Sequence, residues 1–196
     1  MKTQIIIPEN QKIISVEELK EWGYTYYKIN KLVEIGSLIK LNKKNYENVK
    51  FKGEESDFYY VHAYIPIGVV CLMSAAVFHN LSTYRPDAID VAVSKKKTVT
   101  TLPDSPSFKL YYFKKDRFQT GVEIIKDGFN QFQIYDIEKT VVDIIYYRNK
   151  IGIEETKEIL TNYLNRSDRD INKLYRYADI LKCGEVLRTY LEGLIW

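Results

Sequence analysis

Two short helices with matched end signals lie close together near the N-terminus of this chain. Ser15 and Glu18 have the spacing of a capping box, in which the serine side chain accepts from the N3 amide and the glutamate reaches back to the serine amide. Gly23 stands where the first helix needs a residue that tolerates a left-handed conformation. Thr25 can cap a second helix, and Gly36 can close it. The spacing therefore predicts two short helices joined by a tight turn.

A lysine-tipped hairpin follows the second helix. Residues 37–41 and 46–49 favour strands, and the turn Asn42–Asn45 between them carries two lysines. Ile13–Ile14 can add a small third strand that pairs with this hairpin. The whole order is the layout of a winged helix-turn-helix domain. Such domains normally begin with a further helix, but residues 8–11 can form at most one helical turn, so we expect this module to lack that first helix.

The second helix has two predicted faces of different chemistry. At helical spacing, the inner face holds Tyr26, Ile29, Leu32 and Val33, and the outer face holds Tyr27, Asn30, Lys31 and Glu34, with Lys28 at the border. Tyr, Asn and Lys side chains can contact phosphates and base edges. The outer face of the second helix is therefore a candidate surface for DNA contact.

Positive charge is concentrated in this N-terminal segment. Residues 1–52 contain ten lysines and six glutamates, a balance of +4, whereas the other 144 residues carry 19 basic and 20 acidic side chains. A local basic surface is expected of a nucleic-acid reader. The alternative interpretation is an ordinary helical hairpin with a solvated lysine-rich turn, which many α-rich proteins contain.

The remaining chain predicts a larger body of strands followed by helices. Strands are expected at residues 59–65, 88–93, 108–113, 121–125 and 132–135, an apolar helix at 69–79, and C-terminal helices at 138–147, 153–164, 171–181 and 185–194. Asp136 and Asp170 stand where helix caps are wanted. We therefore predict an α+β (mixed α/β) protein with two domains, residues 1–52 and residues 53–196.

The sequence offers no pattern for catalysis or for a cofactor. Two distant cysteines and two histidines cannot form a disulfide scaffold or a His/Cys metal cluster. The candidate metal-binding carboxylates Asp87, Asp90, Glu123, Asp136, Glu138 and Asp143 form no tight motif, and there is no phosphate-binding glycine loop. We therefore expect no enzyme, no cofactor and no metal site.

A second basic surface is a weaker candidate. It would consist of Lys95, Lys96, Lys97, Lys114, Lys115 and Arg117. The favoured reading of these residues is two solvated loop tips.

One long stretch lacks charged residues. Residues 58–84 contain no Asp, Glu, Lys or Arg, which is enough length to span a bilayer. Polar residues interrupt the stretch, and its apolar centre, residues 65–78, has the length of a buried helix. No secretory signal is recognisable at the N-terminus. We expect a cytoplasmic protein without a membrane span.

Three segments beyond residue 52 resemble the AbiEi family of antitoxins from bacterial abortive-infection systems. They are residues 65–83, residues 135–152 with their Glu-Lys-Thr sequence, and residues 170–178, followed by Tyr190–Glu192. Members of this family couple an N-terminal winged helix-turn-helix to such a domain, so the resemblance covers nearly the whole chain in the expected order.

The resemblance implies a function that composition does not reveal. Such proteins repress their own operon by binding inverted repeats in its promoter, and they counteract a cognate nucleotidyltransferase toxin in a type IV toxin–antitoxin system that acts in phage defence. Antitoxin and toxin are not expected to form a stable complex, and a monomer could pair only on DNA. The resemblance places the DNA-reading role on the second helix and the hairpin tip, and its candidate DNA-binding residues here are Thr25, Tyr27, Lys28, Asn30, Lys31, Lys43 and Lys44.

Two other functions stay open at this stage. The N-terminal hairpin could belong to a module that binds a protein rather than DNA, and the chain could be an enzyme that acts on the toxin or on its RNA substrate. Binding to promoter DNA against scrambled DNA separates the first from repression, and metal dependence tests the second.

Overall fold

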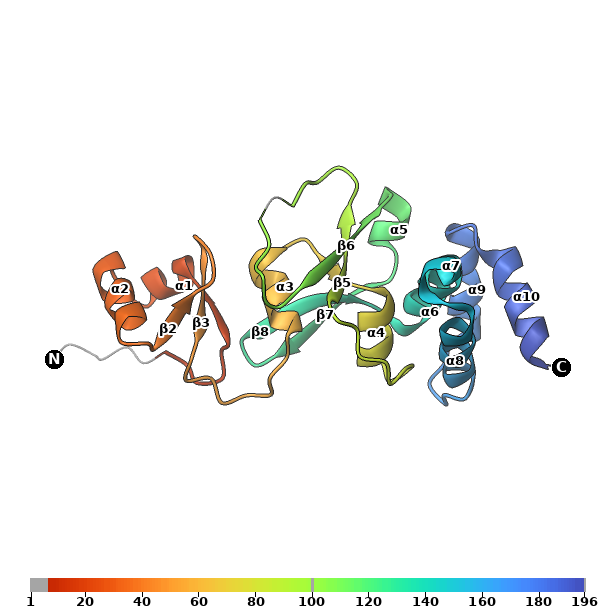
Figure 1. Cartoon of the computed structure of the whole chain (residues 1–196), viewed down its shortest axis with the longest axis horizontal. Helices are drawn as coiled ribbons and strands as arrows, with labels where there is room; N and C mark the ends of the chain where they lie inside the picture. Colours follow the sequence, from red (N-terminus) through yellow and green to blue (C-terminus); the bar gives the residue numbers. More distant parts are fainter. Residues whose placement is uncertain (1–6, 100, 196) are drawn as a thin grey trace. The chain divides into compact units, whose positions relative to one another are not determined.

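The computed structural model describes residues 7–99 and 101–195, and it is a mixed α+β protein (Figure 1). The chain divides into two compact units. The first contains residues 1–66 together with 125–132, and the second contains residues 67–124 together with 133–196. The predicted N-terminal module, residues 1–52, lies within the first unit.

A three-stranded antiparallel sheet forms the centre of the first unit. Its strands are β1 (Ile13–Ser15), β2 (Leu38–Lys40) and β3 (Asn45–Asn48), in the order β1-β3-β2. Ile14 lies opposite Tyr46, and Leu38 lies opposite Asn48. The predicted pairing of the Ile13–Ile14 segment with the hairpin is therefore confirmed.

The two N-terminal helices are α1 (Val16–Glu21) and α2 (Tyr26–Glu34), and their caps are those predicted. The Glu18 amide donates to the Ser15 hydroxyl at 3.1 Å, while the Ser15 amide donates to the Glu18 carboxylate at 2.8 Å. Gly23 and Gly36 have φ values of 78° and 71°, which only glycine adopts without strain. These caps fix where each helix begins and ends.

The core of the first unit lies between these helices and one face of the sheet. It consists of Ile14, Val16, Leu19, Ile29, Leu38 and Tyr46. The prediction that Tyr26 belongs to the inner face of the second helix is wrong, because this residue is 59% exposed. Leu32 and Val33 pack against this core beside the fully buried Ile29, whereas the ring of Tyr26 lies against the ammonium group of Lys20.

The segment predicted as a strand at residues 59–65 is instead the helix α3 (Phe58–Tyr64). Its buried residues are Tyr59, Val61 and Ala63, which alternate as they would in a strand. The alternation arises because the helix is enclosed on several sides rather than along one stripe. In Figure 1, α1 and α2 lie on one side of the β1-β3-β2 sheet and α3 lies on the other.

A five-stranded sheet has the order β6-β5-β4-β8-β7. Its strands are β4 (Val69–Val70), β5 (Ile89–Ser94), β6 (Phe108–Phe113), β7 (Val122–Asp127) and β8 (Asn130–Tyr135). Strand β4 is antiparallel to β5 and parallel to β8, and β5 is parallel to β6. The four strands predicted between residues 88 and 135 are confirmed, with small shifts at their ends.

The apolar helix predicted at residues 69–79 is wrong in its first part. Val69 and Val70 form β4 between β5 and β8, and helix α4 spans only Leu72–Phe78. Both valines are fully buried. A short, fully apolar run at the centre of a sheet has no alternation, so it cannot be told from a buried helix by its sequence.

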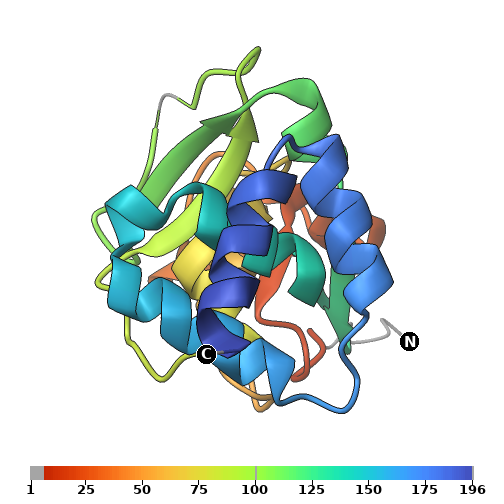
Figure 2. The same cartoon turned by 90° about the vertical axis from the view of Figure 1, so that its right-hand side faces the viewer.

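The rest of the second unit is helical. The helices are α5 (Lys115–Gln119), α6 (Ile137–Tyr146), α7 (Arg148–Ile151), α8 (Ile153–Leu164), α9 (Ile171–Ile180) and α10 (Gly184–Ile195). Asp136 caps α6 and Asp170 caps α9, as predicted. Figure 2 shows the blue C-terminal helices stacked in front of the sheet. None of the described helices combines the length and the apolar character that a bilayer crossing requires.

A buried ion cluster joins α5 to α6. The carboxylate of Asp143 accepts from both Arg117 and Lys139, and Arg117 also donates to the Leu181 carbonyl oxygen at 3.2 Å. Burial lowers the pKa of Lys139, although the neighbouring Asp143 opposes that shift. The suggestion that Arg117 belongs to an exposed basic surface is therefore wrong, because only 9% of this residue is exposed.

We predict that Asp143→Ala destabilises the protein by about 3–5 kcal/mol, because removing one partner leaves buried positive charge without compensation. Urea unfolding followed by far-ultraviolet circular dichroism measures this loss. Asp116→Ala removes an exposed carboxylate from the same region and should change the stability by no more than about 0.5 kcal/mol. Equal losses in the two variants would contradict the structural role of the cluster.

Candidate nucleic-acid interface

The outer face of α2 is a continuous exposed stripe. Tyr27, Asn30, Lys31 and Glu34 are spaced at i, i+3, i+4 and i+7, and all four are exposed, Tyr27 by 67%. Ile29 is fully buried on the opposite side. The prediction of which side chains face outward on this helix is thus confirmed for these four, and Thr25 and Lys28 are exposed as well.

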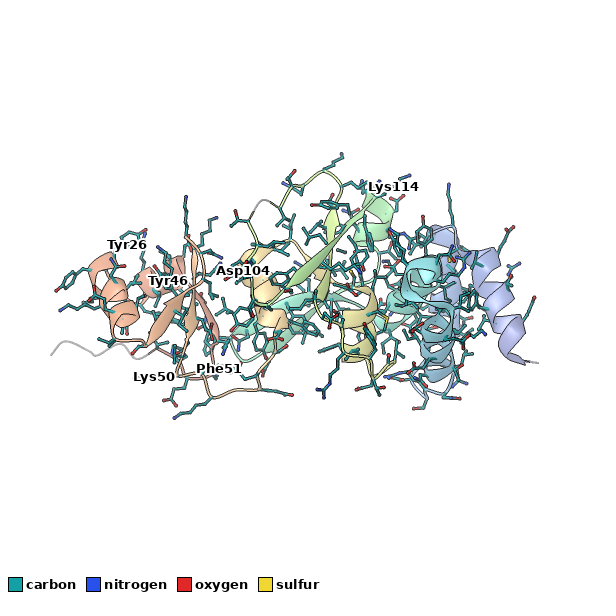
Figure 3. All side chains as sticks on the ribbon, viewed as in Figure 1. Tyr26, Tyr46, Lys50, Phe51, Asp104 and Lys114 are labelled. Atoms are coloured by element: carbon teal, nitrogen blue, oxygen red, sulfur yellow. The ribbon has the colours of Figure 1, made fainter. Side chains whose placement is uncertain are left out.

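Two lysines form cation–π contacts with the tyrosine rings of α2. The ammonium nitrogen of Lys31 lies 4.9 Å from the centre of the Tyr27 ring, and that of Lys20 lies 4.4 Å from the centre of the Tyr26 ring. A cation–π contact at an exposed site contributes about 0.5–1 kcal/mol. Each pair therefore presents a flat apolar surface directly beside a positive charge. The side chain of Tyr26 is labelled on α2 in Figure 3.

The turn between β2 and β3 has a fixed shape. The side-chain oxygen of Asn42 accepts from the backbone amides of Lys44 and Asn45, at 2.8 and 2.9 Å. This arrangement is an Asx turn, which an asparagine at the first position favours. Lys43 and Lys44 are both exposed at the tip. The two lysines are therefore presented on a turn of fixed geometry.

The same turn is tied to the end of α3. The side-chain amide nitrogens (Nδ2) of Asn42 and Asn45 both donate to the backbone carbonyl oxygen of Ala63, at 3.0 and 2.9 Å. We did not single out either asparagine from the sequence, although asparagine in a turn is a usable signal. Their link to Ala63 is not predictable from the sequence, because the partners lie 21 and 18 positions apart and only the fold brings them together.

Helix α3 also covers the face of the sheet that α1 and α2 leave open. Tyr60 is hydrogen-bonded to Glu47 of β3, and burial raises the pKa of this tyrosine, with a further contribution from Glu47. Lys12 forms an ion pair with the same glutamate at 3.1 Å. The sheet of the first unit is therefore supported on both faces.

The turn between β7 and β8 fastens the start of β1. The side-chain oxygen of Asn130 accepts from the backbone amide of Lys12 at 2.7 Å, and the Asn130 amide donates to the carbonyl oxygen of Asn10 at 3.2 Å. The Tyr59 hydroxyl donates to Asp127 at 2.7 Å, which joins α3 to the same turn. These contacts supply the support that a module without a first helix needs.

Five lysines of the suggested second basic surface come together in the second unit. Lys95, Lys96 and Lys97 follow β5, while Lys114 and Lys115 follow β6, and all five are exposed. The two strands are parallel and in register from Ile89 opposite Phe108 to Ser94 opposite Phe113. Both groups of lysines therefore lie at the same end of the strand pair.

The carboxylates considered as metal ligands have structural partners or are exposed. Asp90 accepts from the Met73 amide at 3.1 Å, and burial raises its pKa. Asp136 caps α6, and Glu138 forms an ion pair with Lys173 at 3.0 Å. Asp87 and Glu123 are exposed. Among the residues that the structure describes, no group of three His, Cys, Asp or Glu side chains could hold a metal ion.

Comparisons with known proteins found no match on which a functional argument could rest. No protein-family model matches this chain, and no curated protein matches it. The features available for interpretation are therefore the exposed stripe of α2, the lysine tip of the hairpin and the fixed geometry behind both.

We predict that Asn42→Ala loosens the hairpin turn and destabilises the first unit by about 1–3 kcal/mol, because it removes the hydrogen bonds of this side chain to the Lys44 and Asn45 amides and to the Ala63 carbonyl oxygen. Hydrogen exchange of the Lys44 and Asn45 amides should become faster. Lys43→Ala alters the same turn without removing a described hydrogen bond, and it should leave both quantities unchanged. Unaltered exchange in Asn42→Ala would mean that the turn does not depend on this side chain.

Proposed function

We propose that this chain is a DNA-binding transcriptional repressor of the winged helix-turn-helix type. In this proposal α2 enters the major groove, and the β2–β3 hairpin is the wing that contacts the phosphate backbone. The observation that carries it is the exposed stripe of Tyr27, Asn30 and Lys31 beside a lysine-tipped turn of fixed shape. Recognition helices use such side chains on base edges and phosphates.

The order of elements supports the same proposal. The short strand β1 precedes the two capped helices, and the β2–β3 hairpin follows them. Strand β3 of this hairpin pairs with β1. Side-chain contacts from α3 and from the β7–β8 turn steady this small unit. A reader of DNA benefits from that rigidity, because base contacts require the helix and the wing to hold their spacing.

The resemblance to the AbiEi family extends the proposal to the whole chain. We propose an antitoxin that represses its own operon at inverted repeats and counteracts a cognate nucleotidyltransferase toxin without forming a stable complex with it. An inverted repeat calls for two protein copies, because operator symmetry mirrors protein symmetry. The proposed place of action is the cytoplasm, where promoter DNA is found.

A protein-binding module is the second candidate. The exposed large apolar residues of the first unit include Ile35 by 72%, Phe129 by 59%, Val49 by 50% and Ile39 by 49%. A contiguous patch of such side chains would mark a protein partner rather than DNA. The affinity of the purified full-length chain decides between the two candidates. It is measured on the DNA upstream of its own gene and on a scrambled duplex. Tighter binding to the upstream DNA supports the repressor, and equally weak binding to the two duplexes supports the protein-binding module.

We predict that replacing both wing lysines, Lys43→Ala with Lys44→Ala, weakens binding to every DNA sequence. Each lost phosphate contact should lower the salt slope by about 0.9, so the double variant should lose roughly 1.8. Lys50→Ala with Lys52→Ala removes the same charge at the other end of β3, where Lys50 is labelled in Figure 3, and it should leave the slope nearly unchanged. Equal slope changes in the two double variants would remove the wing from the interface.

We predict that neighbouring residues of α2 give two different classes of variant. Ile29→Ala should cost about 2–5 kcal/mol of stability, because it removes a fully buried side chain. Asn30→Ala should leave stability intact and cost about 1–3 kcal/mol of binding to the upstream DNA. Melting temperature and DNA affinity measured on both variants separate the classes. A stable Asn30→Ala variant with full affinity would contradict the assignment of α2 as the recognition helix.

A further inference from the structure

The first unit contains no arginine. Residues 1–66 carry ten lysines, residues 125–132 carry one more, and the first arginine of the chain is Arg85. Contacts of arginine or lysine with the O6 and N7 atoms of guanine are the commonest specific contacts in the major groove, and the planar fork of arginine fits the two atoms together. Lysine carries a point charge without that fork. The arginine fork on guanine is therefore not available to the first unit, and the planar hydrogen-bonding group on the outer face of α2 is the carboxamide of Asn30.

The exposed stripe of α2 offers two side chains that can contact bases. The carboxamide of Asn30 has a donor and an acceptor in one plane, which matches the N6 and N7 atoms of adenine. One turn earlier, the Tyr27 ring is 67% exposed and is held by the ammonium of Lys31. Its flat apolar face suits the methyl group of thymine, the one apolar group at the floor of the major groove.

We propose that α2 reads adenine–thymine base pairs. This inference rests on the proposed function and names the class of DNA that the same surface takes. Asn30 contacts an adenine, the ring of Tyr27 packs on the methyl group of a neighbouring thymine, and Lys31 meets an adjacent phosphate. Bonding is non-covalent throughout, and the specificity comes from the pairing of donors, acceptors and apolar surface.

Two other residues of α2 fit this assignment. Glu34 could accept from the N4 amino group of cytosine, but it is the last residue of the helix. A recognition helix contacts base edges with its N-terminal residues, so Glu34 lies at the wrong end. Lys28 is in the first turn at the border of the stripe, where a flexible ammonium reaches the sugar–phosphate backbone.

The test begins with the full-length chain and a library of duplexes that carry 20 randomised base pairs. The expected result is enrichment of duplexes with A·T pairs at the selected positions. Changing such a pair to G·C should weaken binding by about 5- to 150-fold. Replacing a contacted thymine by uracil removes one methyl group and should weaken binding by about fourfold. Replacing the contacted adenine by 7-deazaadenine removes the N7 acceptor and should weaken binding by about tenfold.

Matched variants assign these effects to residues. Asn30→Ala should abolish the effect of 7-deazaadenine, and Tyr27→Ala should abolish the effect of uracil, whereas Tyr27→Phe keeps the ring and should keep the uracil effect. Lys31→Ala should weaken binding to all duplexes alike. All three positions of substitution are exposed, so unchanged melting temperatures confirm that each of the four variants folds.

Three outcomes would overturn the inference. Enrichment of G·C pairs at the selected positions would contradict it directly, and so would base preferences that persist in both Asn30→Ala and Tyr27→Ala. Equal binding to all duplexes would refute base reading while leaving DNA binding in place. Absence of any DNA binding would refute the proposed function itself, which distinguishes that failure from the others.

Discussion

The burial of Ile29 sets the orientation of α2, and the candidate interface depends on that orientation. Ile29 belongs to the same buried cluster as Leu19 of α1 and Leu38 and Tyr46 of the sheet. A helix has one rotation that buries this position fully, and at that rotation residues 27, 30 and 31 face outward. The capping bonds at Ser15 and Thr25 then fix where the two helices begin, so packing and local chemistry act on the same few residues.

A core of this size gives only marginal stability by itself. A domain of about fifty residues buries too little apolar surface to be more than marginally stable, so neighbouring segments contribute. Here α3 covers the second face of the sheet through Tyr60 and Glu47, and Ala63 accepts from both asparagines of the hairpin turn. The position of the lysine tip thus depends on residues that come after the hairpin in the sequence.

Local signals were predictable from the sequence, and long-range ones were not. The caps at Ser15, Thr25, Asp136 and Asp170 were predicted because each depends on residues three positions apart. The outward stripe of α2 was predicted from its 3.6-residue period. Helix α3 was missed because it is enclosed on several sides and buries alternate residues. The burial of Arg117 was missed because its partner, Asp143, is distant in the sequence and only the fold brings the two together.

The central claim is that the outer face of α2 touches DNA. Photo-crosslinking tests it most directly: a light-activated amino acid replaces Tyr27 in one sample and Ile180, an exposed residue of the second unit, in the other. Each protein is irradiated with the DNA upstream of its own gene. We predict covalent protein–DNA adducts from position 27 at a yield well above that from position 180. Equal yields from both positions, or adducts from position 180 alone, would contradict the account.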